Sequence, residues 1–475
     1  MSTFLRRPRP GNLLAICAFL FIVALPLRAG ITAGTPPAGD TATFVSISDI
    51  HFNPLSDSAI ASRILHGRGS KWEPLFRSLP PRKPGSYGEE TTYPLLISML
   101  DHMRKTNPHP KFIIITGDFL AHGFRNTFNA AVNRYGGDSS DAAYDLFIFN
   151  TFEFLTGTFA AYYPATPVIP ALGNNDSYCG NYQVGPASEF LKDFARLWAP
   201  LMGRPGDQMK RQFATGGYYS IANPGVARHR IIVLNTIFFS AKYRNSCAPG
   251  APDPGMAELH WLDSALADCL AKKERAWLVY HIPPGIDVFG SVDSSGICGP
   301  KPVPFLGDQY EAGFEGLLLK HHAVIEASFA GHTHVDDFRL LVDSGAAIGY
   351  IHISPAVSPV YDNNPAFQIF QFSPVTAAIH NYTTEYVDLN ASEGWGWKKE
   401  YDFASAYGLP GYSVSTLSTL ARLIDADIRT RAHYQRYFSV SSTFGNALTD
   451  RTWRAFWCGI DHWKSDDFVG CCGAR

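Results

Sequence analysis

The sequence predicts an α/β fold, and three observations support this prediction. Short apolar runs alternate with longer amphipathic segments from about residue 42 to residue 390. The runs are almost continuously apolar, which is typical of strands covered on both faces of a sheet. The chain has 475 residues, 46% of them hydrophobic and 17% charged, so it can bury a large core. The predicted strands are Thr43–Ser48, Phe112–Thr116, Val168–Leu172, Ile231–Leu234, Trp277–Tyr280, Val324–Ala330 and Ile348–Ser354.

The N-terminal segment is typical of an export signal. Three arginines between positions 6 and 9 precede an apolar stretch from Leu13 to Leu27, and small residues follow around Ala29. The stretch is shorter than the ~20 residues that a membrane-spanning helix needs. We therefore predict a cleaved signal peptide over residues 1–29, rather than a retained anchor, and a linker over residues 30–41. The mature protein is expected to be secreted or periplasmic, with no transmembrane segment.

The remaining chain is expected to form a main domain over residues 42–390 and a helical C-terminal subdomain over residues 391–475. After Trp397 the pattern becomes helical, with helices expected at Val414–Asp427 and Ile428–Phe438. The segment Ser56–Thr92 is rich in Pro, Gly and Arg and is expected to be a long insertion over one edge of the fold. Asp336 and Asp337 are expected in a solvated loop.

The cysteine count fits an exported protein, in which disulfides are possible. Cys17 lies in the predicted signal, which leaves seven cysteines, so at least one thiol has no partner within the mature chain. Cys269 falls on a helical pattern and is expected to be a buried, unreactive thiol. No C-x-x-C spacing indicates a thiolate zinc site. The candidate disulfides, whose connectivity the sequence leaves open, are Cys247–Cys298 and Cys458 with Cys471 or Cys472.

The charge balance argues against a nucleic-acid polymer as partner. The chain has 40 Lys and Arg against 42 Asp and Glu, a formal net charge of -2. It therefore lacks the basic field that holds a nucleic-acid backbone, although a nucleotide stays possible as a substrate.

Polar residues restricted to Asp, Asn and His follow five of the predicted strands. Sites in open α/β sheets lie beyond the carboxyl ends of the strands. One polar cluster after a strand would be unremarkable, but five of this composition indicate a shared site. The clusters are Asp49-Ile50-His51, Gly117-Asp118, Gly173-Asn174-Asn175-Asp176, His281 and Gly331-His332-Thr333-His334.

The spacing and chemistry of these clusters predict a metal centre. Asp49 and His51 are two residues apart, as are His332 and His334, and on extended backbone this period sends both side chains to the same side. Glycines beside the clusters permit the tight turns that aim them. Carboxylate, amide and imidazole ligands without thiolate suit Zn, Mn or Fe. Seven such groups exceed the needs of one ion and suit two ions about 3.5–4 Å apart.

The ordered set D-x-H, G-D, G-N-x-D, a lone His and G-H-x-H resembles the calcineurin-like metallophosphoesterase superfamily. This resemblance implies a two-sheet sandwich flanked by helices, with residues 42–390 as the metallophosphoesterase catalytic domain and a small helical C-terminal subdomain. It also implies the ligand roles. The first ion would be held by Asp49, His51 and His334, the second by Asn174, His281 and His332, and Asp118 would bridge both.

Further motifs resemble the acid-sphingomyelinase-like phosphodiesterase branch of that superfamily. Gly117–His122 has the branch's G-D-x-x-x-H form, and His281–Gly285 resembles its second-ion histidine segment. Ser354–Pro359 resembles the stretch that closes its catalytic domain.

Two residues are expected to act directly on the substrate. The superfamily usually has His after the metal-binding Asn, where this chain has Asn175, whose amide can hydrogen-bond a phosphate oxygen but cannot protonate a leaving group. The resemblance implies that His122 protonates the leaving group instead. Phosphate binding is the alternative role for His122. Asp176 is expected to orient a neighbouring residue rather than bind metal.

The resemblance implies a secreted phosphodiesterase that hydrolyses a phosphodiester through hydroxide on two divalent ions, Zn with Mn or Fe as alternatives. The G-N-N-D variant also resembles the endopolyphosphatase branch, which keeps polyphosphate and nucleotide phosphoanhydrides as alternative substrates. A metal-bearing binding protein without turnover is the alternative of another class. A lipid head-group is a further candidate substrate. Substrate choice is expected to lie in Ser56–Thr92 and in the loop after Asn175.

Overall fold

The computed structural model describes residues 41–246, 248–250, 252–292, 299, 301–391, 395–444 and 447–473. Contacts divide the chain into Met1–Thr35 and Pro36–Arg475, and every described residue belongs to the second unit. The predicted signal peptide and all of the predicted linker except residue 41 therefore lie outside the described residues.

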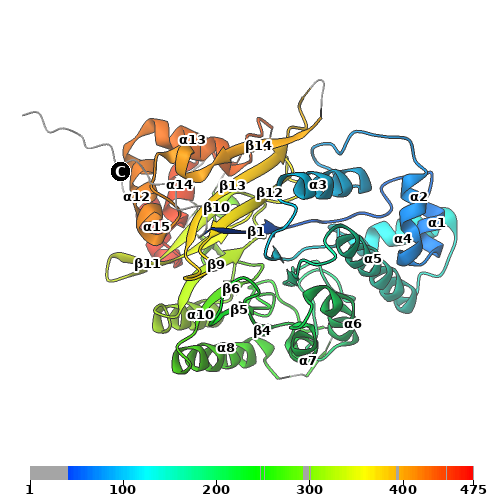
Figure 1. The fold of residues 1–475 in the computed structure, drawn as a ribbon, viewed down its shortest axis with the longest axis horizontal. Coiled ribbons are helices and arrows are strands. Elements are labelled where there is room, and N and C mark those ends of the chain that lie inside the picture. Colours follow the sequence, from blue (N-terminus) through cyan, green and yellow to red (C-terminus); the bar gives the residue numbers. More distant parts are fainter. Residues whose placement is uncertain are drawn as a thin grey trace, which may run out of the picture. The chain divides into compact units, whose positions relative to one another are not determined.

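Two six-stranded mixed sheets form the centre of this unit (Figure 1). In the first sheet β1, β2 and β3 run parallel, and in the second β5, β6, β9 and β11 do. The α/β sandwich of two sheets is therefore confirmed. The first sheet has the order β14 (Trp397–Asp402), β13 (Ile379–Val387), β12 (Ala366–Phe372), β1 (Ala42–Ile47), β2 (Ile113–Ile115) and β3 (Val168–Pro170). The second has the order β10 (Asp337–Asp343), β11 (Ala346–Ile353), β9 (Ile325–Ala330), β6 (Arg275–Val279), β5 (His229–Val233) and β4 (Tyr219–Ala222).

All seven predicted strands are present, whereas β4, β10, β12, β13 and β14 were not predicted. The unpredicted strands pair antiparallel with their neighbours at the outer side of each sheet. β13 and β14 mix buried with partly exposed positions and so lack a continuous apolar run. A small hairpin, β7 (Ile286–Asp287) with β8 (Val303–Pro304), lies apart from both sheets.

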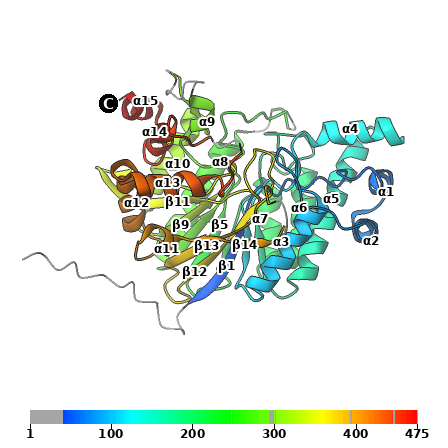
Figure 2. The ribbon, with the colours of Figure 1, turned by 90° about the horizontal axis from the view of Figure 1, so that it is seen from above.

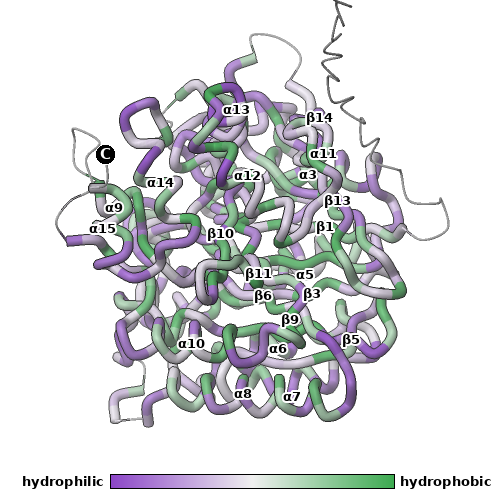
Figure 3. Tube along the Cα trace, turned by 90° about the vertical axis from the view of Figure 1, so that its left-hand side faces the viewer, coloured by the Kyte–Doolittle hydropathy of each residue, from purple (hydrophilic) through white to green (hydrophobic). Residues whose placement is uncertain are grey.

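Aromatic side chains fill the space between the two sheets. Phe44 on β1 stacks on Phe370 of β12 with ring centroids 4.9 Å apart. The same ring reaches the second sheet at Trp277 on β6, 5.2 Å away, and at Phe329 on β9, 5.4 Å away. Hydrophobic segments of the chain gather around the labels of the central strands β6 and β11 (Figure 3). Aromatic pairs of this kind add about 0.5–1.5 kcal/mol each to the gain from area burial.

Helices cover the outer faces of both sheets. α8 (Pro254–Ala271) packs on β6, α10 (Asp308–Lys320) packs on α8, and α12 (Val414–Ala426) packs on β11. α3 (Tyr93–Thr106) contacts β14. Within the part of the chain that is described, no helix combines the length and the apolar character needed to cross a bilayer. The other helices are α1 (Ala61–His66), α2 (Trp72–Arg77), α4 (Phe124–Tyr135), α5 (Asp141–Tyr162), α6 (Glu189–Trp198), α7 (Gly206–Gly216), α9 (Val288–Ser291), α11 (Phe403–Tyr407), α13 (Ile428–Phe438), α14 (Trp453–Gly459) and α15 (Ser465–Gly473), with 3-10 turns η1 (Gly69–Lys71) and η2 (Ala199–Met202).

The segment Ser56–Thr92 carries α1, η1 and α2, which pack beside α4 and α5 (Figure 2). Its last residues return to the first sheet. The backbone N–H of Thr91 donates to the carbonyl of His51 at 3.1 Å, and the N–H of Asn53 donates to the carbonyl of Thr91 at 2.9 Å. The end of the insertion is therefore joined to the D-x-H loop.

The C-terminal helices α12 and α13 confirm the two predicted helices to within a residue. The chain after Trp397 begins with a strand, however, and β14 pairs with β13 of the first sheet. The sequence did not predict this strand, and residues 397–402 extend the first sheet before the expected helices begin. The domain boundary at residue 390 stays a prediction.

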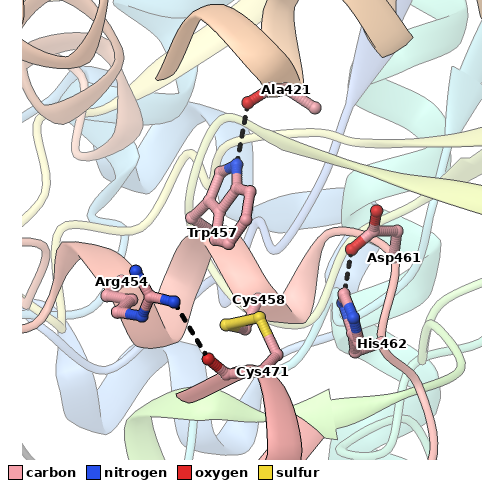
Figure 4. The surroundings of a disulfide bond; sticks show 7 residues. All are labelled: Ala421, Arg454, Trp457, Cys458, Asp461, His462 and Cys471. Carbon is pink, nitrogen blue, oxygen red and sulfur yellow. Dashed lines mark hydrogen bonds and ion pairs between the residues drawn. A yellow bond between two sulfur atoms is a disulfide. The ribbon is translucent and has the colours of Figure 1, made fainter. Parts of the chain in front are cut away.

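A disulfide links two of the C-terminal helices (Figure 4). Cys458 of α14 bonds to Cys471 of α15, with 5.8 Å between their Cα atoms. This confirms the first of the two partners proposed for Cys458. The predicted buried thiol is also confirmed at Cys269 in α8. The proposed pair Cys247–Cys298 lies outside the described residues.

The expectation of a solvated loop at Asp336 and Asp337 was wrong. Asp336 is buried and accepts hydrogen bonds from the hydroxyls of Tyr401 at 2.8 Å, Thr384 at 2.9 Å and Tyr382 at 3.2 Å. Burial raises the pKa of Asp336 to about 7. The hydroxyl partners lie on β13 and β14, far along the sequence, so the local pattern could not show that this turn is covered.

Candidate metal centre

The five polar clusters meet where the parallel strands of both sheets end. Clusters follow β1, β2 and β3 in the first sheet and β6 and β9 in the second. Backbone hydrogen bonds join the loops, because Asp49 N–H donates to the Gly117 carbonyl at 3.0 Å and Gly331 N–H to the His281 carbonyl at 3.0 Å. The structure thereby brings all seven predicted ligands into one buried cluster.

One group of donor atoms surrounds the side chain of Asp49. The Nε2 atoms of His51 and His334 are 3.1 Å apart. Asp49 Oδ1 lies 3.3 Å from His334 Nε2 and 3.7 Å from His51 Nε2. These three residues are the ones expected to hold the first ion.

A second group surrounds His281. Its Nε2 lies 3.1 Å from Asn174 Oδ1 and 3.2 Å from His332 Nδ1. Asp118 lies between the groups, since its Oδ2 is 3.3 Å from His281 Nε2 and 3.5 Å from His51 Nε2. This is the position that a bridging carboxylate needs.

Five of the seven predicted ligands adopt the left-handed backbone region. Side chains with a Cβ disfavour this region by about 1–2 kcal/mol per residue, so its repetition marks a constrained site. The expected convergence of each pair is confirmed, but the reason given for it was wrong, because the backbone is not extended there. The positive φ angles are 50° at Asp49, 44° at His51, 57° at Asp118, 75° at His332 and 62° at His334.

Two glycines allow the loops to approach one another closely. A Cβ on Gly331 would lie 2.0 Å from Ser48 Oγ, and one on Gly173 would lie 2.1 Å from Asp118 Oδ1. Any larger residue would therefore displace the loops that carry the ligands.

Hydrogen bonds fix which atom of each ligand faces the cluster. His51 Nδ1 donates to the Leu120 carbonyl at 2.9 Å, and His281 Nδ1 donates to the Thr116 carbonyl at 2.8 Å. Both Nε2 atoms are consequently lone-pair acceptors in the neutral rings. Asn174 donates its amide to Asn181 Oδ1 at 2.8 Å, which turns its own oxygen inward. Asn181 had not been predicted and carries no motif that would reveal it.

Asn175 and Asp176 both hold the loop that carries Asp118. Asn175 donates to Asp118 from its backbone N–H and from its side-chain amide, each at 2.8 Å. Its amide is thus directed to Asp118 rather than to a substrate. Asp176 accepts from four backbone N–H groups, those of Asp118, Phe119, Leu120 and Gly173, at 2.9–3.1 Å.

The chemistry of this cluster fits divalent cations. Acceptor atoms face one another at 3.1–3.5 Å, and Asp49 Oδ1 is buried with no hydrogen-bond donor among the described residues. Burial alone would raise the pKa of Asp118, but His281 and His51 hold it below the usual carboxyl range. Burial would lower the pKa of His281, yet the charge of Asp118 raises it to about 9. The negative potential therefore favours a positive charge at the centre of the cluster.

His122 lies beside the cluster, at the wall of an open cavity of about 510 Å³. Its ring stacks on His51 with centroids 4.0 Å apart, and its Nε2 lies 3.3 Å from the Tyr361 hydroxyl. Lys242 and the exposed ring of Phe289 also line this cavity.

The cavity walls differ from those expected. Asn181 and Tyr182, in the loop after Asn175, line the cavity as predicted. Among the lining residues that the structure describes, none comes from Ser56–Thr92, and the C-terminal Phe438 and Phe456 take part instead. The C-terminal region reaches the site by folding over β10, a long-range placement that sequence spacing does not show.

A two-sheet sandwich with these loops defines a metallophosphoesterase, and comparison with known families agrees. The profile of the calcineurin-like phosphoesterase family matches residues 42–336. The chain belongs to this family, which makes it a hydrolase of phosphoric esters, and the family fold implies a dinuclear metal site.

Among individual proteins, the chain is similar to acid sphingomyelinase-like phosphodiesterase 3b of Mus musculus, with 28% identity over 90% of this chain and 89% of the relative. It is 25% identical to the cyclic GMP-AMP phosphodiesterase SMPDL3A of Homo sapiens over 96% of each chain. It is 27% identical to sphingomyelinase phosphodiesterase C of Dictyostelium discoideum over 75% of this chain and 76% of that one.

Proposed function

We propose that this protein is a secreted phosphodiesterase that hydrolyses a small phosphodiester with the help of two divalent ions. The observation that carries the proposal is the cluster of possible ligand atoms on either side of Asp118, whose Oδ2 lies 3.5 Å from His51 Nε2 and 3.3 Å from His281 Nε2. Zinc is the metal that we propose, with Mn or Fe as alternatives, because the donor set mixes carboxylate, amide and imidazole without thiolate.

The residue roles follow from the two groups. Asp118 would bridge the ions through its carboxylate. The other proposed ligands are Asp49, His51 and His334 for the first ion, and Asn174, His281 and His332 for the second. When bound, the ions would supply an activated water and would neutralise charge on the phosphate oxygens.

His122 would act on the departing group. Its Nε2 is on the cavity side, near the Tyr361 hydroxyl, and its ring lies against the cluster, with a ring nitrogen within 4.8 Å of those of His51 and His334. A phosphate held at the cluster would therefore place an ester oxygen within reach of this imidazole, which can donate a proton as the P–O bond breaks. Asn175 would act indirectly, by holding Asp118 in its bridging position.

The substrate class that we propose is a small phosphodiester such as a nucleotide or a lipid head-group. The cavity has the size of a small-molecule site, and its walls include aromatic rings at Phe289, Phe305 and Tyr361. The names of the relatives, which are phosphodiesterases, support the diester over a monoester. The predicted export signal supports action outside the cytoplasm.

A phosphoanhydride hydrolase is the second candidate, and one observation favours it. Lys242 lines the same cavity, with its ammonium 5.6 Å from the Tyr182 ring centroid. Tyr182 in turn lies 3.4 Å from His332, so the lysine is placed to receive a second phosphate group. Asn175 does not favour this candidate, because its amide is directed to Asp118.

One assay distinguishes the proposed phosphodiesterase from the phosphoanhydride hydrolase. Purified protein is stripped with a chelator, reloaded with Zn, Mn or Fe, and assayed with bis-p-nitrophenyl phosphate, p-nitrophenyl phosphate and polyphosphate. We expect activity that returns with metal and is largest for the diester. Turnover of polyphosphate in preference to the diester would favour the second candidate, and activity that survives chelation would contradict both.

A further inference from the structure

Glu90 makes the most direct contact with His122 from outside the metal cluster. Its Oε1 accepts the side-chain Nδ1–H of His122 at 2.9 Å and the backbone N–H of the same residue at 3.0 Å. Its Oε2 accepts from the Ser358 hydroxyl at 3.1 Å. The Glu90 side chain is only 16% exposed, so the carboxylate is largely shielded from water.

The carboxylate is held in place by loops that also carry the ligands. Thr91, the next residue, exchanges backbone hydrogen bonds with the D-x-H loop at His51 and Asn53. Ser358, the other partner of Glu90, donates its backbone N–H to the Asp49 carbonyl at 3.0 Å. Glu90 is therefore fixed relative to the cluster from both sides, although it lies in the insertion rather than in any metal-binding motif.

We propose that Glu90 is the positioning residue for His122: it holds the Nδ1–H of the imidazole and thereby directs Nε2 into the cavity. The inference rests on the proposed function, because it assumes that His122 acts on the departing oxygen. Rotation of the ring by half a turn would place Nδ1 toward the substrate and remove the hydrogen bond to Glu90. The double contact of Oε1 with the His122 backbone and side chain opposes that rotation.

The geometry also defines the path of the proton. As the P–O bond to the leaving group breaks, the proton on His122 Nε2 passes to the departing oxygen. The proton on Nδ1 stays on the ring, in its hydrogen bond to Glu90. The attacking water forms the new P–O bond and releases a proton, and this proton restores the Nε2–H of His122, so no other reactant is needed.

The role can be tested with two substrates that differ in their leaving group. Bis-p-nitrophenyl phosphate releases p-nitrophenolate, which departs without a proton, whereas glycerophosphocholine releases an alcohol that needs one. Glu90→Ala is expected to lower kcat for glycerophosphocholine by roughly 10–100-fold, as loss of a carboxylate that orients a functional histidine does. The same variant should change bis-p-nitrophenyl phosphate turnover by less than about threefold and leave the metal content intact.

Two further variants show whether Glu90 acts through His122. The double variant Glu90→Ala/His122→Ala should be no slower than His122→Ala alone, since residues that act as a unit are not additive. Glu90→Gln keeps an acceptor oxygen and the shape of the side chain, so it should lie between wild type and Glu90→Ala, and it serves if the alanine variant folds poorly. Glu89→Gln, the same change at the exposed neighbouring residue, is the matched control and should have no effect.

Each outcome decides between definite alternatives. Equal losses on both substrates in Glu90→Ala and Glu90→Gln, or a double variant that is slower by the product of the two effects, would overturn the positioning role. Lost metal would indicate that Glu90 supports the cluster instead. If His122→Ala itself slows both substrates equally, the acid role in the proposed function fails and this inference with it. If His122→Ala is selective and the Glu90 variants are not, only this inference fails.

Discussion

Fully buried histidines in this protein differ in the hydrogen-bond partners of their ring nitrogens. His352, on β11 in the core, accepts from the Tyr412 hydroxyl at 2.7 Å and donates to Gln368 Oε1 at 2.6 Å, so both ring nitrogens are satisfied. His51 and His281, at strand ends, have one nitrogen on a backbone carbonyl and the other facing acceptors. Burial alone thus does not mark a metal ligand. A candidate metal ligand is instead indicated by a buried ring nitrogen that faces other acceptor atoms and no hydrogen-bond donor.

This contrast predicts that changes in the strand-end cluster remove metal and activity, whereas changes at the core histidine alter stability alone. The largest effect is expected at Asp118. Asp118→Asn should lower kcat by more than about 100-fold, because even residues that only support a ligand cost 10–100-fold when lost. A neutral amide also balances two dications poorly. Kinetics and elemental analysis check both effects, with Asp263→Asn on the surface as control. A near-normal rate with full metal content would remove the two-ion assignment.

A smaller loss is expected at Asn175, which touches the cluster only through Asp118. Asn175→Ala should weaken metal affinity or activity by roughly 10–100-fold, because the bridging carboxylate loses its side-chain donor. Competition with a chelator measures the affinity. Asn223→Ala, at another buried asparagine bonded to His229, is the control for loss of a buried amide. If Asn175 instead binds phosphate, the variant should keep its metal and show a raised KM.

The smallest effect concerns His352 and appears only as pH-dependent stability. Burial lowers the pKa of His352 to about 4, although the hydrogen bond with Gln368 opposes the shift. An unfolded histidine titrates near 6.5, so the unfolded state binds the proton first and stability falls as the pH drops below about 6.5 toward 4. Between pH 7 and pH 5 the loss from this residue is about 2 kcal/mol.

His352→Gln should reduce that pH dependence while metal content and turnover at pH 7 stay close to wild type. Denaturant unfolding at the two pH values, with wild type in parallel, measures the difference. An unchanged pH dependence would show that His352 is not buried in its neutral form.

Much of the fold and of the cluster could be predicted because the signals are local. Strands such as Phe112–Thr116 are continuous apolar runs, and five of the seven predicted runs end directly in predicted ligands. The residues that sequence reasoning missed act over long separations. Asn181 orients Asn174, Glu90 holds His122, and Phe456 reaches the cavity from the C-terminal helices. These contacts depend on how loops from different strands meet, which spacing within one loop does not determine.

Backbone conformation was the other source of error. Asp49 and His51 were expected on extended backbone because their spacing suits it, yet both have positive φ angles of 50° and 44°. A left-handed residue other than glycine is locally unfavourable, so propensity argues against it, and only the surrounding loops maintain it. The residues of the cluster could be predicted from their residue types, whereas the backbone geometry that makes them converge could not.

The central claim is that the strand-end cluster binds two divalent ions that are needed for hydrolysis. The most direct test titrates chelated protein with Zn while bound metal and bis-p-nitrophenyl phosphate turnover are measured on the same samples. We expect binding to saturate at about two ions per chain, with activity rising as the second ion binds. Saturation at one ion with full activity, or full activity in the metal-free protein, would contradict this account.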